Sequence, residues 1–268
     1  MLSLFAFVIL QPRVDVQKNV VYREIAGEKL MCDIYRPTTP GRKKAVAVFH
    51  GGAWVAGQRQ DMAPLCEKIA SEGMVAITFQ YRLAPKHKWP SMREDALAAI
   101  QWIRANEGKY DLDVRQIGAL GASAGAHLAM LTGYLPTAPG KYSSRTQAII
   151  NFFGPTDMAV DYPASVDALY FLVLGKKRAD AAQEIFEASP VKFVDRGDAP
   201  TYTMHGKMDQ VVPFKQAERL QEALAGARID RKFHPIDNIG HELPVTNAEV
   251  VQSINESMLW LKKYLRVR

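Results

Sequence analysis

The sequence predicts an α/β fold with a mostly parallel central sheet, an antiparallel strand pair on its N-terminal side and helices on both faces. Short uninterrupted apolar runs recur along the chain, and such runs are typical of parallel strands that are buried on both faces. Amphipathic stretches with helical spacing lie between them, so strands and helices alternate. The 268 residues contain no repeat and no linker, which favours a single domain.

The predicted strands begin with the antiparallel pair, at residues 20–25 and 30–35, with a turn at Gly27. Buried strands follow at residues 45–49, 74–79, 117–120, 148–153 and 201–204, and a further strand is predicted at 231–234. Because crossovers between parallel strands are right-handed, the carboxyl ends of these strands should meet at one edge of the sheet. We expect the ligand site at that edge.

Helices are predicted where apolar residues recur at i, i+3, i+4 and i+7, at residues 62–69, 96–103, 126–134 and 250–265. The segment of about residues 156–200 interrupts the alternation of strands and helices. Two short helical patterns within it, at residues 166–174 and 181–188, predict a cap-like excursion that lies over the strand ends and shapes the site. Residues 19–268 are thus predicted to be one catalytic domain.

Residues 1–18 precede this regular pattern. The apolar run at residues 2–10 is far shorter than the roughly 20 residues that span a bilayer, so no membrane span is expected. It resembles the apolar part of an export signal, but no basic residue precedes it and no small-residue cleavage site follows. We expect a signal remnant, with a secreted or periplasmic location, or alternatively an arm packed on the body of a cytoplasmic protein.

Charge and cysteine content exclude several function classes. The net charge of +6 favours acidic partners, but the basic residues are scattered apart from one cluster at residues 42–44, so nucleic-acid binding is not expected. Cys32 and Cys66 fit two buried thiols, with a disulfide between them as the alternative. No ligand spacing indicates a metal, and we expect no cofactor.

The strongest functional pattern is GASAG at residues 121–125, which fits G-x-S-x-G. A predicted strand leads directly into it and a predicted helix leads directly out. In such a strand–turn–helix the serine adopts a strained backbone conformation that exposes its Oγ atom. The pattern therefore predicts Ser123 as a nucleophile.

A serine hydroxyl needs a base that takes its proton and an acid that orients the base. Asp209 follows the strand at 201–204 and precedes the next helix, whereas three competing aspartates do not: Asp195, Asp198 and Asp237. His241 lies after Gly240 in the loop before the last helix, whereas His234 lies inside a strand pattern. We predict that Asp209 and His241 complete a triad with Ser123.

Acyl transfer also needs hydrogen-bond donors where the oxyanion forms. The loop HGGAW, residues 50–54, ends the strand at 45–49. The backbone N–H groups of Gly51 and Gly52, together with that of Ala124, are predicted to form this oxyanion hole.

Three aromatic residues near these motifs are expected to support the site without taking part in the chemistry. His50 is expected to brace the HGGAW loop, and Trp54 to form a pocket wall or anchor the loop. His127 lies one helical turn beyond Ser123. We predict that Trp54 and His127 lie at the substrate site, with His127 better suited to support than to chemistry.

Five ordered motifs together resemble the esterase/lipase branch of the α/β-hydrolase fold: HGGAW, YRLAP at residues 81–85, GASAG, the GKMD loop that ends at Asp209, and the GH pair at residues 240–241. The resemblance covers residues 19–265. It is nearest to small single-domain esterases, including bacterial feruloyl and acetyl esterases, and more distant to the hormone-sensitive-lipase group. It implies a serine carboxylesterase that cleaves short-chain acyl esters, of small molecules or carbohydrates, through an acyl-enzyme.

The chain departs from the hormone-sensitive-lipase pattern at Ala53, where that group has a third glycine, and a long N-terminal cap is not seen. The acyl-chain preference of that group is therefore not expected here. The resemblance also implies a structural ion pair between Arg82 and Asp95.

Two rival interpretations stay open. HGGAW with this triad also resembles kynurenine formamidase, which cleaves an N-formyl amide through the same kind of tetrahedral intermediate. A hydrolase-fold binding protein without catalysis is the other alternative, although such proteins usually lack the serine or the histidine.

Overall fold

The computed structural model describes residues 13–267, so the apolar run at residues 2–10 lies outside the described part of the chain. Eight strands form one sheet in the order β1-β2-β4-β3-β5-β6-β7-β8. Their bounds are β1 Val14–Ile25, β2 Glu28–Pro37, β3 Lys43–Phe49, β4 Val75–Phe79, β5 Leu112–Ala122, β6 Ala148–Phe152, β7 Thr201–Gly206 and β8 Arg231–Ile236. β2 is antiparallel to β1 and β4, and all other pairs are parallel. The predicted fold class is confirmed.

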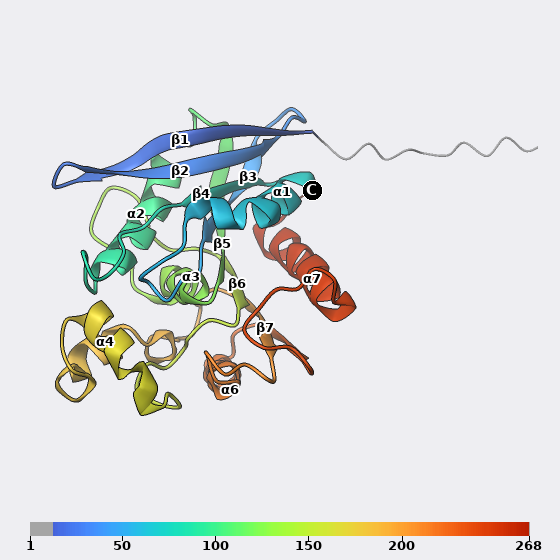
Figure 1. Ribbon diagram of the computed structural model, residues 1–268. Helices are drawn as coiled ribbons and strands as arrows, with labels where there is room; N and C mark the ends of the chain where they lie inside the picture. Colours follow the sequence, from blue (N-terminus) through green and yellow to red (C-terminus); the bar gives the residue numbers. More distant parts are fainter. Residues whose placement is uncertain (1–12, 268) are drawn as a thin grey trace, which may run out of the picture.

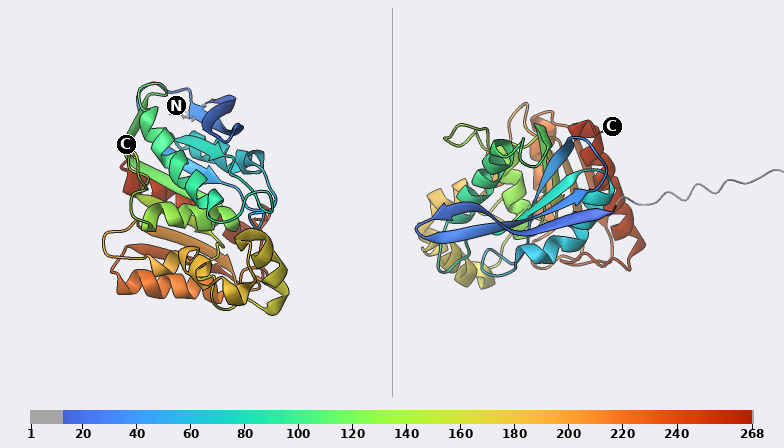
Figure 2. Two further views of the ribbon diagram at one scale, coloured as in Figure 1. Left: turned by 90° about the vertical axis from the view of Figure 1, so that its left-hand side faces the viewer. Right: turned by 90° about the horizontal axis from the view of Figure 1, so that it is seen from above.

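Helices cover both faces of the sheet (Figures 1 and 2). Their bounds are α1 Ala63–Ser71, α2 Ser91–Ala105, α3 Ala124–Tyr134, α4 Asp167–Leu174, α5 Ala182–Glu187, α6 Lys215–Gly226 and α7 Ala248–Leu265. Apolar side chains of α1 and α7 share one hydrophobic cluster with alternate residues of the strands, whereas α2 and α3 pack on the other residues of the same strands. α6 joins that second face through Leu220, which packs with Ile149 of β6. None of the described helices is long and apolar enough to cross a bilayer.

The first strand begins earlier than the sequence pattern predicts. β1 starts at Val14, which pairs with Pro37, so residues 14–18 belong to the sheet. The register shifts between Gln17 and Val20, and Asn19 has a positive φ of 58°. This irregularity breaks the alternation of apolar and polar residues, which explains why the pattern concealed the first half of the strand.

Both cysteines are free and buried, so the alternative of a disulfide is wrong. They belong to different hydrophobic clusters, Cys32 with α2 and Cys66 with α7. Burial raises the pKa of both thiols well above the usual range, which keeps them protonated.

The excursion between β6 and β7 contains α4 and α5, as the two helical patterns predicted. Tyr170 and Val173 of α4 are buried against the body of the protein. Phe171 and Leu172, in contrast, are 51% and 39% exposed. The apolar face of this short helix therefore holds the excursion on the domain, and two large side chains remain in solvent.

Candidate active site

The loops that follow the parallel strands meet at one edge of the sheet, because β3, β5, β6, β7 and β8 all run in the same direction. The HGGAW loop follows β3, and Ser123 follows β5 directly. Asp209 lies in the loop after β7 and His241 in the loop after β8. Every candidate residue is thus supplied by a strand end, and the rigid sheet fixes their relative positions.

Ser123 occupies a sharp turn between β5 and α3. Its φ of 55° and ψ of −124° are strained for a residue with a side chain. The turn can close because glycines stand two residues before and two residues after Ser123. A Cβ atom at Gly121 would lie 2.2 Å from the carbonyl carbon of Gly125, and one at Gly125 would lie 2.1 Å from the carbonyl oxygen of Phe49. Only glycine fits at either position.

The three predicted triad residues form one hydrogen-bonded chain. The Nε2 atom of His241 lies 2.7 Å from the Oγ atom of Ser123, and its Nδ1 atom lies 2.7 Å from the Oδ2 atom of Asp209. The exposed fraction of the His241 side chain is 16%, and that of the Asp209 side chain is 0%. A proton on Nδ1 directed at Asp209 leaves Nε2 free to accept the serine proton, which is the arrangement that general-base activation requires.

The carboxylate of Asp209 is held ionised by its surroundings. Burial raises its pKa, but hydrogen bonds from His205 and His241 and from the amide of Val212 outweigh burial and hold the pKa well below the usual range. The Oδ1 atom accepts bonds of 2.8 Å from the amides of Val211 and Val212. Asp209 therefore presents a fixed negative charge to the imidazole of His241.

His205 is a site residue that the sequence analysis missed. It lies in β7 and is fully buried. Its Nε2 atom lies 2.9 Å from the carbonyl oxygen of Val212 and 3.2 Å from the Oδ2 atom of Asp209. Both neighbours accept hydrogen bonds, so Nε2 carries the proton. His205 precedes Asp209 by four residues, and no pattern in the sequence indicates that the turn after β7 brings the two side chains together.

Phe153 is a second residue that the analysis did not single out. It follows β6, and its ring packs against the ring of His241 with centroids 4.7 Å apart. Its φ of 44° is strained, and its amide donates to the carbonyl oxygen of Met204. This strained position fixes the aromatic ring that supports the imidazole.

The HGGAW loop lies beside the serine. A Cβ atom at Gly51 would lie 3.5 Å from the Cβ atom of Ser123, and one at Gly52 would lie 2.1 Å from the carbonyl oxygen of Ala56. Within residues 13–267, the amides of Gly51, Gly52 and Ala124 donate to no protein acceptor. The predicted oxyanion-hole donors are therefore next to the nucleophile and unused in the free protein.

His50 braces this loop, as predicted. It is buried, its Nδ1 atom lies 2.7 Å from the carbonyl oxygen of Gly51, and its ring stacks on Tyr81 at 4.2 Å. The hydroxyl of Tyr81 donates to the carbonyl oxygen of His50 over 2.8 Å. Burial lowers the pKa of His50, so the ring stays neutral. The ring packs between the HGGAW loop and Tyr81.

Trp54 and His127 contact each other. The Nε1 atom of Trp54 donates to the Nδ1 atom of His127 over 3.3 Å, and the Nε2 atom of His127 donates to the carbonyl oxygen of Ala188 over 2.7 Å. Both side chains are buried, with 5% and 1% exposure. Both ring nitrogens of His127 are thus occupied, and contact of Trp54 and His127 with the substrate stays a prediction. The pair ties the HGGAW loop and α3 to the end of the excursion.

The ion pair implied by the resemblance is present. The Nε atom of Arg82 lies 2.8 Å from the Oδ2 atom of Asp95, and the amide of Arg82 donates to the same oxygen over 2.9 Å. Asp95 is fully buried, and Arg23 donates to its other oxygen. The pair fixes the YRLAP turn onto α2.

The competing polar residues are occupied elsewhere. Asp198 pairs with Arg145, Asp237 with Lys207, and His234 with Glu256. Across residues 13–267 no group of three or more His, Cys, Asp or Glu side chains is arranged to hold a metal ion.

Comparisons with known proteins agree with this architecture. The family model described as BD-FAE matches residues 32–224. Esterase LipC of Mycobacterium tuberculosis is 32% identical over 84% of this chain and 59% of its own length, and esterase LipQ of the same organism is 30% identical over 75% and 51%. The chain thus spans between half and three fifths of these curated relatives.

Solved structures resemble the chain over nearly its full length. A propionate-bound esterase of Thermogutta terrifontis superposes with a TM-score of 0.79 at 26% identity and covers 94% of both chains. A truncated carbohydrate esterase from gut microbiota superposes with a TM-score of 0.81 at 25% identity, over 95% of this chain and 97% of that one.

Proposed function

The chain belongs to the BD-FAE family, and from that premise we propose that it is a serine carboxylesterase with Ser123 as nucleophile, His241 as general base and acid, and Asp209 as the orienting carboxylate. The observation that carries the proposal is the continuous chain of two 2.7 Å contacts from Asp209 through His241 to Ser123 at the carboxyl edge of the sheet. The names of the relatives, esterases in each case, support the reaction class.

The proposed reaction has two halves. His241 takes the proton of the Ser123 hydroxyl through Nε2 while Oγ attacks the ester carbonyl, and the resulting imidazolium is stabilised by Asp209. The imidazolium then gives its proton to the leaving alcohol, and an acyl-enzyme remains. His241 then takes a proton from a water molecule as this water attacks the acyl-enzyme. The imidazolium returns the proton to the Oγ atom of Ser123, which releases the acid and regenerates the free serine.

The amides of Gly51, Gly52 and Ala124 are the proposed donors to the oxyanion. They are unused in the free protein, so no internal hydrogen bond must break when the charge develops. Removal of one such donor typically lowers the rate of the chemical step about 10²–10³-fold.

The proposed substrates are esters with short acyl groups, on a small or carbohydrate alcohol. Structures of the Thermogutta esterase with bound propionate and butyrate support a short acyl group. The similarity to a carbohydrate esterase supports a carbohydrate alcohol. An activated amide is the second candidate substrate. Hydrolysis of an ester and hydrolysis of an activated amide by such a triad pass through the same kind of tetrahedral intermediate.

Turnover of p-nitrophenyl acetate tests the proposal. Ser123→Ala should lower kcat on the order of 10⁶-fold, because the triad acts as a unit. Ser71→Ala, at the end of α1, is the matched control and should retain full activity. A Ser123→Ala variant with a tenth of the activity would contradict the assignment. N-formyl anilides in the same assay distinguish the amide hydrolase: faster turnover of the anilide than of the acetate would favour it.

A further inference from the structure

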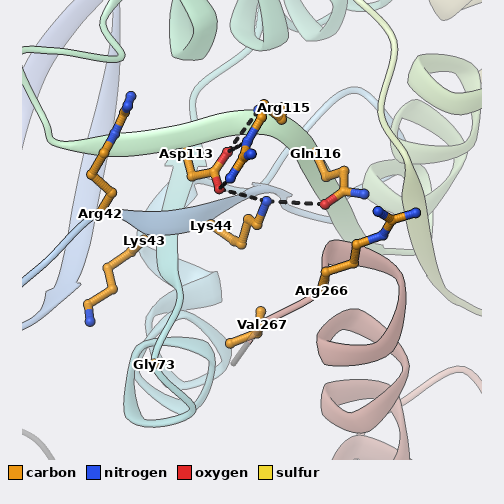
Figure 3. A pocket seen from close by; sticks show the side chains of 9 residues that line it. All are labelled: Arg42, Lys43, Lys44, Gly73, Asp113, Arg115, Gln116, Arg266 and Val267. Atoms are coloured by element: carbon orange, nitrogen blue, oxygen red, sulfur yellow. Dashed lines mark hydrogen bonds and ion pairs between the residues drawn. The ribbon is translucent and has the colours of Figure 1, made fainter.

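A cavity of about 590 Å³ lies at the opposite edge of the sheet from Ser123 (Figure 3). The beginnings of β3 and β5, the turn after α1 and the end of α7 surround it. Its lining residues are Arg42, Lys43, Lys44, Gly73, Asp113, Arg115, Gln116, Arg266 and Val267. In the register of β3 and β5, Asp113 lies opposite Lys44 and Gly121 lies opposite Phe49, so about five strand residues, roughly 20 Å, separate the cavity from the turn that carries Ser123.

The lining of this cavity is strongly positive. It contains five cationic side chains and one carboxylate, a net charge of +4, against a formal net charge of +6 for the whole chain. The lining therefore carries a positive excess, which Glu107 reduces from outside the cavity through its ion pair with Arg42.

The negative charge of the single carboxylate, Asp113, is already offset by two cationic side chains. Asp113 accepts from Arg115 over 2.6 Å and from Lys44 over 2.9 Å, and these three side chains converge in Figure 3. The hydrogen bond from Arg115 is the main cause that holds the pKa of Asp113 well below its usual range. Asp113 is thus ionised, and it offsets only one of the two cations that it contacts.

Two other lining cations have no carboxylate partner within residues 13–267. Lys43 donates to the carbonyl oxygen of Pro40 over 2.8 Å, and Arg266 forms no ion pair. Arg42 contacts Glu107 and, at 4.0 Å, Asp111 outside the cavity. Lys43 and Arg266 are therefore two cationic side chains at the cavity whose charge no carboxylate of residues 13–267 offsets.

The ends of two helices reduce this charge only slightly. α1 ends at Ser71 and α7 at Leu265, and their carboxyl ends lie near the cavity. Each end carries a partial charge of about −0.5, so the two together offset roughly one of the four unit charges. A clear positive excess remains.

We propose that this cavity binds a compact polyanion, a small molecule with two or more phosphate or carboxylate groups. The volume suits a small ligand, since such sites usually measure about 300–1,000 Å³. Guanidinium groups form bidentate hydrogen bonds with the oxygens of phosphate and carboxylate groups. Two of the five lining cations, Lys43 and Arg266, form no ion pair within residues 13–267 and can supply charge to such a ligand. The site is remote from Ser123, so the inference does not depend on the proposed function.

Isothermal titration of the full chain with pyrophosphate, and separately with citrate, at 50 mM NaCl tests the proposal. One equivalent of one or both anions should bind, and which of them binds more tightly identifies the phosphate or the carboxylate class. Acetate, with one charge, should bind much more weakly. Affinity should fall as salt rises, because the interaction is between charges.

A double variant, Lys43→Gln with Arg266→Gln, should weaken the binding on the order of tenfold or more. Lys141→Gln with Lys177→Gln removes the same charge from two exposed lysines elsewhere and should leave the affinity unchanged. Both pairs should retain turnover of p-nitrophenyl acetate, which also shows that they fold. Absence of saturable binding by either anion, or equal binding by the two double variants, would overturn the proposal.

Discussion

At the scale of single residues, the contacts of Asp209 bear directly on the proposed role of His241 as general base. Asp209 accepts hydrogen bonds from two backbone amides on Oδ1 and from two imidazoles on Oδ2. His205 supplies one of these bonds from the fully buried interior of β7, and its Nδ1 atom has no partner within residues 13–267. A buried polar atom without a partner costs stability, so His205 is a position where local stability is given up for the orientation of Asp209.

His205→Phe should therefore lower kcat on the order of tenfold while KM changes little, because the loss falls on the orientation of the triad. The pKa of Asp209 should rise, since one of the bonds that lowers it is gone. His205→Gln keeps a donor at similar reach and should restore most of the activity. Kinetics over a range of pH, together with urea unfolding, separate this from a purely structural effect. Equal loss of kcat in both variants would contradict the positioning role.

At the scale of elements, the site depends on contacts between a loop, a helix and the excursion. His127 of α3 joins all three, because it binds Trp54 on one nitrogen and the carbonyl oxygen of Ala188 on the other. Burial lowers its pKa from 6.5 to about 4, partly offset by the carbonyl of Ala188. His127 is thus neutral in the folded protein over the whole range in which a free imidazole becomes charged.

The folded protein should consequently lose stability as pH falls from about 6.5 to about 4. In that window the unfolded chain binds a proton at His127 that the folded chain does not, so protonation favours unfolding. This group alone should account for about 2 kcal/mol between pH 7 and pH 5. Urea unfolding of the wild type and of His127→Gln at both pH values measures it. The variant should lose less stability on acidification by about that amount; identical pH dependence would show that His127 does not remain neutral.

At the scale of the whole molecule, the central sheet separates the candidate active site from the cationic cavity. Its carboxyl edge collects Ser123, Asp209 and His241, and its amino edge collects the cationic cavity. In the excursion between β6 and β7, Tyr170 packs into the domain, whereas Phe171 and Leu172 are exposed.

This arrangement should favour esters with acyl groups of two to four carbons. Each methylene that enters an apolar pocket contributes about 0.8 kcal/mol. Because Phe171 and Leu172 of α4 lie in solvent, we expect only the first few methylenes of a tail to be buried. We expect kcat/KM for p-nitrophenyl esters to level off early and to decline toward twelve carbons. An optimum at ten carbons or more would show that the excursion closes over the acyl chain in solution.

The sequence predicted the features that depend on local pattern. Apolar runs indicated the parallel strands, and the paired glycines around Ser123 indicated the tight turn, because only glycine allows the approach seen at Gly125. The excursion helices were also recognisable from their spacing. What the sequence concealed depends on tertiary contacts: the irregular start of β1, the mutual burial of Trp54 with His127, and the bond from His205 to Asp209. No periodicity encodes such contacts.

The most direct test of the central claim is covalent labelling with paraoxon, followed by intact-protein mass spectrometry and peptide mapping. Structures of the Thermogutta esterase phosphorylated by paraoxon and phosphonylated by sarin show that this related fold accepts such reagents. We expect one diethylphosphoryl group per chain, located on Ser123, with loss of p-nitrophenyl acetate turnover in proportion to labelling and no adduct on Ser123→Ala. This result would support the assignment of Ser123 as the nucleophile. An adduct on another residue, or full turnover by a chain labelled at Ser123, would contradict it.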